Sequence, residues 1–307
     1  SLTQFACMVI AGYICRSALL PFVTDIYGDN YPADKRATFF SKPLLLSVGI
    51  AALSGFIGSW FLELDIKNYH WIFTFLGFCA MAKAFAIYSM PSKTVENTPH
   101  THPFGNMKYV WLDKSFGYVL LTWFIMGFAN LWTLPLRIDY ITAPEWGIEG
   151  SAMFVAMIIT VIPETLRMLL IPYWASLFDR MNFVVLRMIL NLFFGLGVLL
   201  FFVTSNPWII GLGAGLIGAA FAGGSIAWNL WVTKYAPPGK TGAYMSVHVS
   251  LTGIRGTIGP ILGFWTVNQI GAQNIGILSC SMMFFATLML IPQIKHGRNM
   301  LLNGKSL

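Results

Sequence analysis

Apolar residues along this chain are grouped in long stretches that short polar segments separate. A stretch of about 20 apolar residues is long enough to cross a hydrocarbon layer about 30 Å thick as an α-helix. None of the stretches alternates with a period of two, as the strands of a membrane β-barrel would. The pattern therefore predicts nine spanning helices, at residues 3–24, 43–64, 69–90, 116–136, 151–174, 184–204, 208–231, 241–268 and 273–293.

Charged side chains are too few to cover a water-soluble protein of this size. Of the 307 residues, 56% are hydrophobic and 10% are charged, whereas soluble domains carry about 25% charged residues. Disordered, collagen-like and coiled-coil proteins need more charge, more proline or a heptad repeat. The composition excludes a soluble enzyme and predicts an all-α polytopic membrane protein whose main surroundings are the lipid bilayer.

The basic residues indicate how the helices are oriented. The net charge is +7, and in a membrane protein such an excess is typical of cytoplasmic loops rather than of nucleic-acid binding. Thirteen Lys and Arg residues fall in one alternating set of connections, namely 25–42, 91–115, 175–183 with its adjoining turn, 232–240 and the tail. The other set holds only Lys67 and Arg137. We expect an integral protein of a bacterial inner membrane, with loop 91–115 and the C-terminus cytoplasmic.

One polar segment divides the chain. Residues 91–115 are rich in proline and polar side chains, which is typical of a linker. They separate three helices within 1–90 from six within 116–294, and a tail follows at 295–307.

Two parts of the chain also resemble each other. Tyr31 to Trp60 and Tyr235 to Trp265 each have a polar entry that leads into a glycine-rich helix with a tryptophan near its end. This likeness indicates two related six-helix halves, the first of them incomplete, unless two glycine-rich helices resemble each other by chance.

Three short motifs carry a family resemblance. They are Pro21 with the polar loop that holds Pro32 and Arg36, the aromatic segment 68–73, and Trp174-Ala-Ser-Leu-Phe-Asp-Arg-Met-Asn182. The chain resembles the Major Facilitator Superfamily (MFS) of transporters, seen as helices four to twelve of twelve. The third motif resembles the superfamily loop Gly-x-x-x-Asp-Arg-x-Gly-Arg-Arg but departs from it, because Ala175 and Asn182 replace glycines and Phe183-Val184 replace the basic pair. Asn182 can still adopt the left-handed turn geometry that glycine would supply.

The resemblance implies a function and a mechanism. Two bundles would rock around a midplane site, so that a small solute gains access from each side in turn. The central cavity would lie between helices four, seven, ten and eleven, with parts of five and eight. Asp179, with Arg180 beside it, would face the start of a neighbouring helix and hold one conformation through the helix dipole. The alternative is that Asp179 is a solvated loop acid.

Charged residues inside the predicted spans each need an explanation, because a charge at the bilayer centre costs about 2.5–3.5 kcal/mol on insertion scales. Five such residues are present: Arg16, Lys83, Glu164, Arg167 and Arg255. Lys83 lies near a helix end and is expected to extend to the interface. The remaining cations outnumber the one acid, and Arg binds carboxylate or phosphate well. This surplus predicts a small anionic solute, unless acids elsewhere in the protein neutralise it.

The candidate site residues follow from position and from the resemblance. Those expected to bind solute are Arg16, Arg255, Asn130, Trp132, Trp228 and Asn229. Those expected to act in coupling or as a conformational switch are Glu164, Arg167, His248, Asp179 and Arg180. Glu164 and Arg167 are three residues apart and share a helix face, so they form either a proton switch or a permanent structural clamp.

Small residues form a further pattern in the second half of the chain. Glycines that predict close helix packing lie at Gly218, Gly223, Gly224, Gly253, Gly256, Gly259 and Gly263.

No motif for covalent chemistry is present. Nothing resembles a nucleotide-binding loop, a zinc-protease motif or a nucleophile elbow, and His100 and His102 lack a third metal ligand at a suitable spacing. We therefore expect no enzyme activity, cofactor, metal or nucleic-acid partner. The expected function is a secondary transporter, either symporter or antiporter. The alternative is a non-transporting subunit that serves the structure or assembly of a larger complex with membrane-protein partners.

Overall fold

The computed structural model describes residues 2–91, 105–146, 148 and 151–295, which are helical throughout apart from short connections, with no β-strand among them. Nine helices are long, and they are α1 (Leu2–Asn30), α2 (Arg36–Leu64), α3 (Tyr69–Tyr88), α5 (Lys114–Thr133), α8 (Ile162–Arg180), α9 (Phe183–Phe202), α10 (Pro207–Leu230), α11 (Thr241–Ile270) and α12 (Ala272–Leu290). Three are short, namely α4 (Tyr109–Leu112), α6 (Leu136–Thr142) and α7 (Ala152–Ala156).

The predicted fold class is confirmed. Each predicted apolar stretch coincides with one long helix, and the stretch 151–174 is covered by α7, the π-helix Met157–Val161 (η4) and α8. Among the described residues, seven of the long helices are apolar and long enough to cross a membrane, and α11 falls outside that set. In α11 the reason is its composition, because five glycines, His248 and Arg255 lower its hydropathy.

Several predicted connections are shorter in the structure than expected, and the one at 25–42 is reduced to residues 31–35 between α1 and α2. Residues 92–104, with His100 and His102, lie outside the described residues, but the rest of the predicted linker contains the 3-10 turn Gly105–Lys108 and α4. The predicted loop 175–183 is mostly helix, because α8 continues to Arg180. The structure therefore places Asp179 in the last turn of α8 rather than in a loop.

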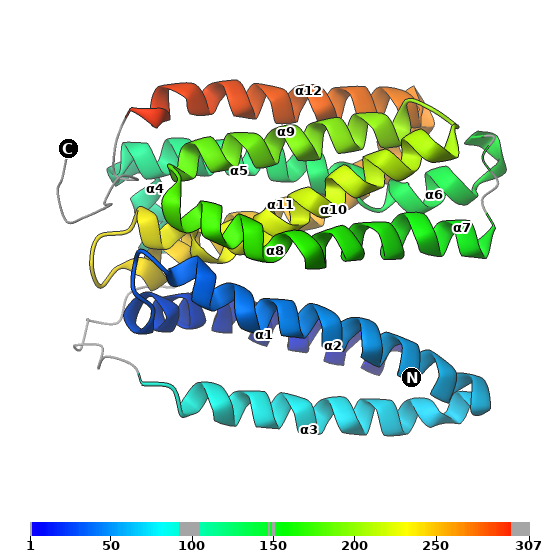
Figure 1. Cartoon of the computed structure of the whole chain (residues 1–307), viewed down its shortest axis with the longest axis horizontal. Helices are drawn as coiled ribbons and strands as arrows, with labels where there is room; N and C mark the ends of the chain where they lie inside the picture. The colour runs from blue at the N-terminus through cyan, green and yellow to red at the C-terminus, as the bar shows by residue number, and fades with distance from the viewer. Residues whose placement is uncertain (1, 92–104, 147, 149–150, 296–307) are drawn as a thin grey trace.

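Helices α5 and α8–α12 pack into one bundle, which forms the upper body in Figure 1. In this bundle α10 packs against α8 and α9, α12 packs against α9 and α5, and α11 packs against α5. Buried aromatic and aliphatic side chains from all six helices fill its interior. We call these six helices the second bundle.

The first three helices contact the second bundle at one end only. α1 packs against α11 and α2 against α8, through residues such as Ala37, Phe40 and Val48, which join the core around Trp174 and Phe178. Farther along α2 the apolar side chains are exposed, as at Trp60. No described residue of α3 is buried, and this helix lies on the far side of α1 and α2 from the second bundle (Figure 1).

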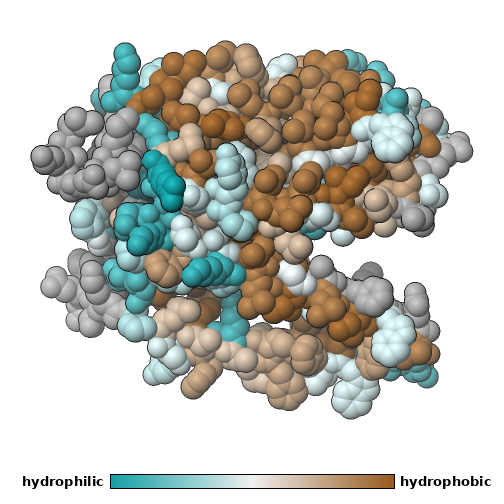
Figure 2. Space-filling model, in the orientation of Figure 1, coloured by the Kyte–Doolittle hydropathy of each residue, from teal (hydrophilic) through white to brown (hydrophobic). Residues whose placement is uncertain are grey.

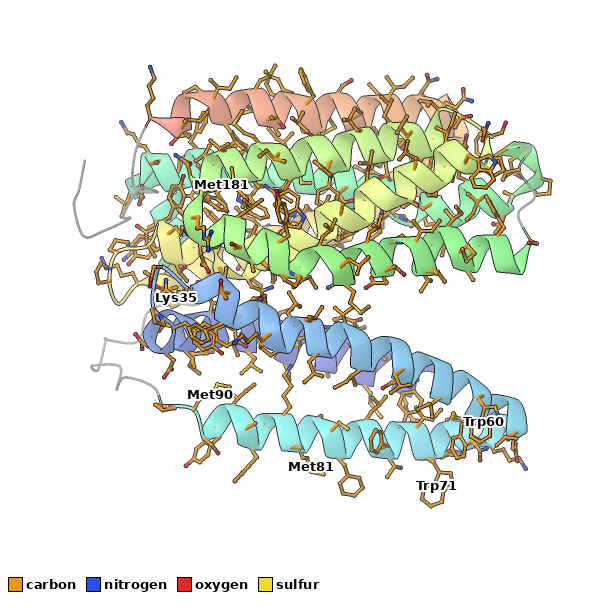
Figure 3. The ribbon with its side chains drawn as sticks, viewed as in Figure 1. Lys35, Trp60, Trp71, Met81, Met90 and Met181 are labelled. Atoms are coloured by element: carbon orange, nitrogen blue, oxygen red, sulfur yellow. The ribbon has the colours of Figure 1, made fainter. Side chains whose placement is uncertain are left out.

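The two ends of the molecule therefore differ. We call the end that carries the connections 31–35, 181–182 and 235–240 the polar end. Lys35 and Met181 lie there, whereas Trp60 and Trp71 lie toward the opposite end (Figure 3). Figure 2 shows hydrophilic residues gathered at the polar end. It also shows a hollow between the two bodies, which are helices α1–α3 and the second bundle, and this hollow opens away from the polar end. The hollow is bordered mostly by hydrophobic surface.

The local geometry of the two similar segments agrees with a repeat. Lys35 precedes α2 with φ −131° and ψ 11°, and Lys240 precedes α11 with φ −118° and ψ 7°. Both segments thus start a long helix at the equivalent position and with nearly the same backbone turn.

Close glycine packing occurs at some of the predicted positions. A Cβ on Gly218 would lie 2.5 Å from Pro163 Cα, and one on Gly223 would lie 2.5 Å from Leu190 Cδ2. Gly259 and Gly263 lie close to α5, where a Cβ would be 3.1 Å from Leu131 Cβ and 2.4 Å from Trp132 O, respectively. The prediction is wrong for Gly253 and Gly256, because a Cβ there would have no neighbour within 4 Å.

We predict that Gly218→Ala destabilises the second bundle by about 1–3 kcal/mol, since the new methyl group meets the rigid backbone of Pro163. Thermal unfolding of the purified protein, followed by circular dichroism, should show a lower Tm. Gly256→Ala is the matched control and should leave Tm unchanged or slightly higher, because alanine favours helix over glycine. Equal Tm changes in both variants would contradict close packing at Gly218.

Candidate functional site

The carboxylate of Asp179, at the end of α8, binds the first turn of α2. Its Oδ1 accepts a hydrogen bond from Ala37 N at 2.8 Å, and its Oδ2 accepts from Thr38 N at 2.8 Å and Thr38 Oγ1 at 2.7 Å. The first amides of a helix have no partner within the helix and carry the positive end of its dipole. Asp179 is 4% exposed, so it is a buried helix cap that joins the two bodies and not a solvated acid.

Two basic residues surround this contact. Lys234 Nζ donates to Phe178 O at 2.8 Å and interacts electrostatically with Asp179. Arg36 donates to Gly28 O at 2.7 Å and to Tyr31 O at 3.2 Å, which fixes the connection between α1 and α2. Burial lowers the pKa of Arg36 from its ordinary value, while the carboxylates of Asp179 and Asp29 oppose that shift.

The residues that follow Asp179 differ from expectation. Arg180 is exposed. Asn182 has φ −58° and ψ 123°, so it does not adopt the left-handed turn that asparagine allows. Its side chain instead accepts a hydrogen bond from Val184 N at 2.8 Å and caps α9. Phe183 and Val184, where the superfamily motif has basic residues, are fully buried in the core beneath this turn.

Glu164 and Arg167 form the predicted ion pair on α8. Arg167 Nη1 lies 3.1 Å from Glu164 Oε1, and Arg167 Nη2 donates to Ser225 Oγ on α10 at 3.2 Å. The side chains are 43% exposed for Glu164 and 25% for Arg167, so the pair is only partly buried by its neighbours. Just before it lie the π-helix η4 and Pro163, which packs on Gly218. Such π-turns frequently occur at functional sites.

Arg255 and His248 lie inside the second bundle rather than on an open surface. Arg255 Nη1 donates to Trp123 O, and its Nη2 donates to Thr252 Oγ1 at 3.0 Å. The His248 ring contacts the rings of Trp123, Trp228 and Trp231, with centroids 5.1 to 5.4 Å apart. His248 is 1% exposed.

The other predicted solute-binding residues have separate surroundings. Asn130 Oδ1 accepts from Arg137 Nη2 at 2.8 Å, and Trp132 Nε1 donates to Thr266 Oγ1 at 2.8 Å, which joins α5 to α11. Asn229 Nδ2 donates to Ser225 O at 2.7 Å, and Trp228 is half-buried beside His248.

Arg16 is exposed on α1. Among the described residues, no hydrogen bond or ion pair joins Arg16 to Arg255. The structure thus gathers Trp228 with His248, and Asn229 with Arg167 around Ser225, but it does not bring all six predicted solute-binding residues together.

Two buried cations were missed by the sequence reasoning. Arg187 was counted with a cytoplasmic turn and Arg137 with an outer loop, yet they are 2% and 7% exposed. Arg187 could have been found, because it falls within the predicted span 184–204 and four residues before Asn191, on the same helix face. Arg137 directly follows the predicted span 116–136, where an exposed loop residue is expected. No sequence pattern indicated that it would be buried in α6.

Comparison with known proteins settles the family. The sequence model described as Major Facilitator Superfamily matches residues 1–260. The chain belongs to the Major Facilitator Superfamily. A search of curated proteins found no match to this chain. As a member of the superfamily, the protein is an integral membrane transporter that handles small-molecule solutes within the lipid bilayer.

We predict that Asp179→Ala weakens the joint between α8 and α2 in this MFS protein. Loss of a helix cap costs about 1–2 kcal/mol, or a factor of about 5–30 in an equilibrium. Spin labels on Lys35→Cys and Met181→Cys, with the four native cysteines replaced, should report a larger population of long distances at the polar end. Asp34→Ala, an exposed acid in the same connection, is the control. An unchanged distance distribution in Asp179→Ala would argue against the joint.

Proposed function

We propose that this MFS protein is a secondary active transporter that moves a small anionic solute by alternating access. The observation that carries the proposal is the polar joint at Asp179, which lies where the two bodies meet, beside a hollow that opens at the other end (Figure 2). A few hydrogen bonds hold the closed end, and contacts of this kind can break and reform during a transport cycle. The rocking motion would open the polar end when the Asp179 contacts release.

The direction of opening follows from the charge of the connections. The Lys and Arg residues of the predicted cytoplasmic set include those around the polar end, such as Lys35, Lys234 and Lys240. In this proposal the polar end faces the cytoplasm of a bacterial cell, and the structure corresponds to a state that is open to the outside.

The charge of the interior supports an anionic solute. Arg16 is exposed on α1, and the Arg167 guanidinium is partly exposed on α8. Arg255 is almost fully buried. We therefore assign it a contribution to the positive electrostatic potential of the interior rather than direct contact with the solute. Trp228 and Asn229 remain candidates for the uncharged part of the solute.

We predict that Arg16→Gln lowers the uptake of the transported anion by about tenfold or more, as expected when a charged hydrogen bond is lost. The measurement is uptake of radiolabelled monocarboxylates, dicarboxylates and phosphate esters into proteoliposomes. Lys83→Gln, which removes an exposed cation from α3, is the control and should retain wild-type uptake.

Two results would oppose this assignment. Undiminished uptake in Arg16→Gln would remove Arg16 from the solute site. A folded wild-type protein that takes up none of the labelled solutes would favour the alternative of a structural or assembly subunit.

Coupling to protons would involve Glu164. It is the acid that the sequence places within a predicted span, and its partner Arg167 also reaches Ser225 on α10. Protonation of Glu164 would release Arg167 from the pair, and the freed guanidinium could then hold an anionic solute. This role treats the pair as a switch and not as a clamp.

We predict that wild-type uptake rises when the outer medium is acidified and that Glu164→Gln loses this pH dependence, because glutamine cannot gain a proton. The measurement is initial uptake rate against external pH in proteoliposomes. Glu145→Gln, an exposed acid outside α8, should keep the wild-type profile. An unchanged profile in Glu164→Gln, together with a lower Tm, would identify the pair as a structural clamp.

A further inference from the structure

Two arginines converge on one turn of α5 inside the second bundle. The Arg187 guanidinium, from α9, lies over the Trp123 ring with Cζ 3.5 Å from the ring centroid, and its Nη2 lies 2.9 Å from Met126 Sδ. The Arg255 guanidinium, from α11, donates to Trp123 O and packs on Gly127, where a Cβ would lie 2.7 Å from its Nε. Trp123, Arg187, His248 and Arg255 therefore form one group, which we call the cationic cluster.

The charges in the cationic cluster are uncompensated. The partners of Arg187 and Arg255 are an aromatic ring, a thioether, a carbonyl and a hydroxyl, none of which carries a negative charge. The two guanidinium groups repel each other electrostatically, and arginine stays protonated in proteins. Buried charge without a counter-charge is strongly destabilising.

The acids of the second half are placed elsewhere. In residues 105–146 and 151–295, Glu164 pairs with Arg167 and Asp179 caps α2. Asp113 accepts hydrogen bonds from Tyr244 and Phe116 N at the start of α5, and Asp139 and Glu145 follow the far end of that helix. None of these described acids is a partner of the cluster, so an anion that enters it would supply the counter-charge that they do not.

Unpartnered hydrogen-bond donors lie in the same region. Trp123 Nε1, Arg255 Nε and Asn191 Nδ2 are buried donors without a partner, and the acceptor Asn191 Oδ1, one helical turn beyond Arg187, also lacks one. A buried donor without an acceptor costs about 1–3 kcal/mol. Each of these residues is at most 5% exposed, so an acceptor that serves them must be small.

We propose that the cationic cluster binds a chloride-sized monovalent anion. Arg187 and Arg255 would hold its charge, and the free N–H groups of Trp123 and Asn191 would complete its surroundings. The anion would neutralise the repulsion between the two guanidinium groups and so stabilise the packing of α5, α9 and α11. This site lies within the second bundle, where His248 joins it to Trp228, and its test does not depend on transport.

The experiment measures the Tm of the purified full chain in detergent, in sodium chloride, sodium gluconate or sodium acetate at equal ionic strength. Chloride should raise Tm by about 5 °C once its concentration is about 100 times its dissociation constant, whereas gluconate should not. Acetate tests whether a carboxylate is the natural occupant. Stabilisation by acetate equal to that by chloride would overturn the assignment to a monatomic anion, and equal Tm values in chloride and gluconate would overturn the site.

Variants test whether the chloride-dependent change in Tm arises from the cationic cluster. Arg187→Met and Arg255→Met should lose the chloride-dependent shift, and Arg137→Met, a buried arginine in α6 outside the cluster, should retain it. Without chloride, Arg187→Met should have a Tm at or above that of the wild type, because one of two repelling charges is removed. If Arg187 only packs on Trp123, Arg187→Met lowers Tm in all media and keeps the chloride shift, which would overturn the proposal. Should Arg255→Met fail to fold, Asn191→Leu replaces it and should weaken the chloride shift.

Discussion

The three hydrogen bonds that Asp179 accepts from the start of α2 tie α8 to a helix more than 140 positions away in the sequence. Around them the connection of α1 to α2 is held by Arg36, and the core of the second bundle takes in Phe40 and Val48. Beyond these residues the two bodies separate and the hollow begins (Figure 2). One buried carboxylate therefore lies at the end where the two bodies meet, and the mechanism proposed above is built on that contact.

Much of the fold could be predicted from hydropathy alone. In lipid every backbone polar group must be satisfied within the helix, so apolar stretches of sufficient length leave little choice of structure. The likeness of residues 31–60 to 235–265 was also informative, because it located two helix starts whose N-cap geometry is nearly the same. The C-terminal end of α8 was harder to predict, since Asp179 and Arg180 look like loop residues although α8 continues to Arg180.

Only part of the candidate site could be predicted from the sequence. The position of a residue along a predicted span does not determine which residues of other helices its side chain contacts. Glu164 and Arg167 were found as a pair since both lie on one helix face, a local relation. The surroundings of Arg255 depend on α5 and α9, which are distant in sequence, so its burial against Trp123 could not be inferred. Asn182 shows the same limit, since its choice between a left-handed turn and a helix cap depends on how α8 and α9 meet.

The π-helix Met157–Val161 has a consequence for the direction of the side chains around it. A π-turn holds more residues than an α-turn, and each residue of an α-helix turns the chain by about 100°. The side chains of α7 are therefore rotated about the helix axis relative to the positions that a continuous α-helix with α8 would give them. Phe154 packs against the core of the second bundle, and Pro163 lies against Gly218. A single helical period drawn through residues 152–180 would misplace one of these two faces.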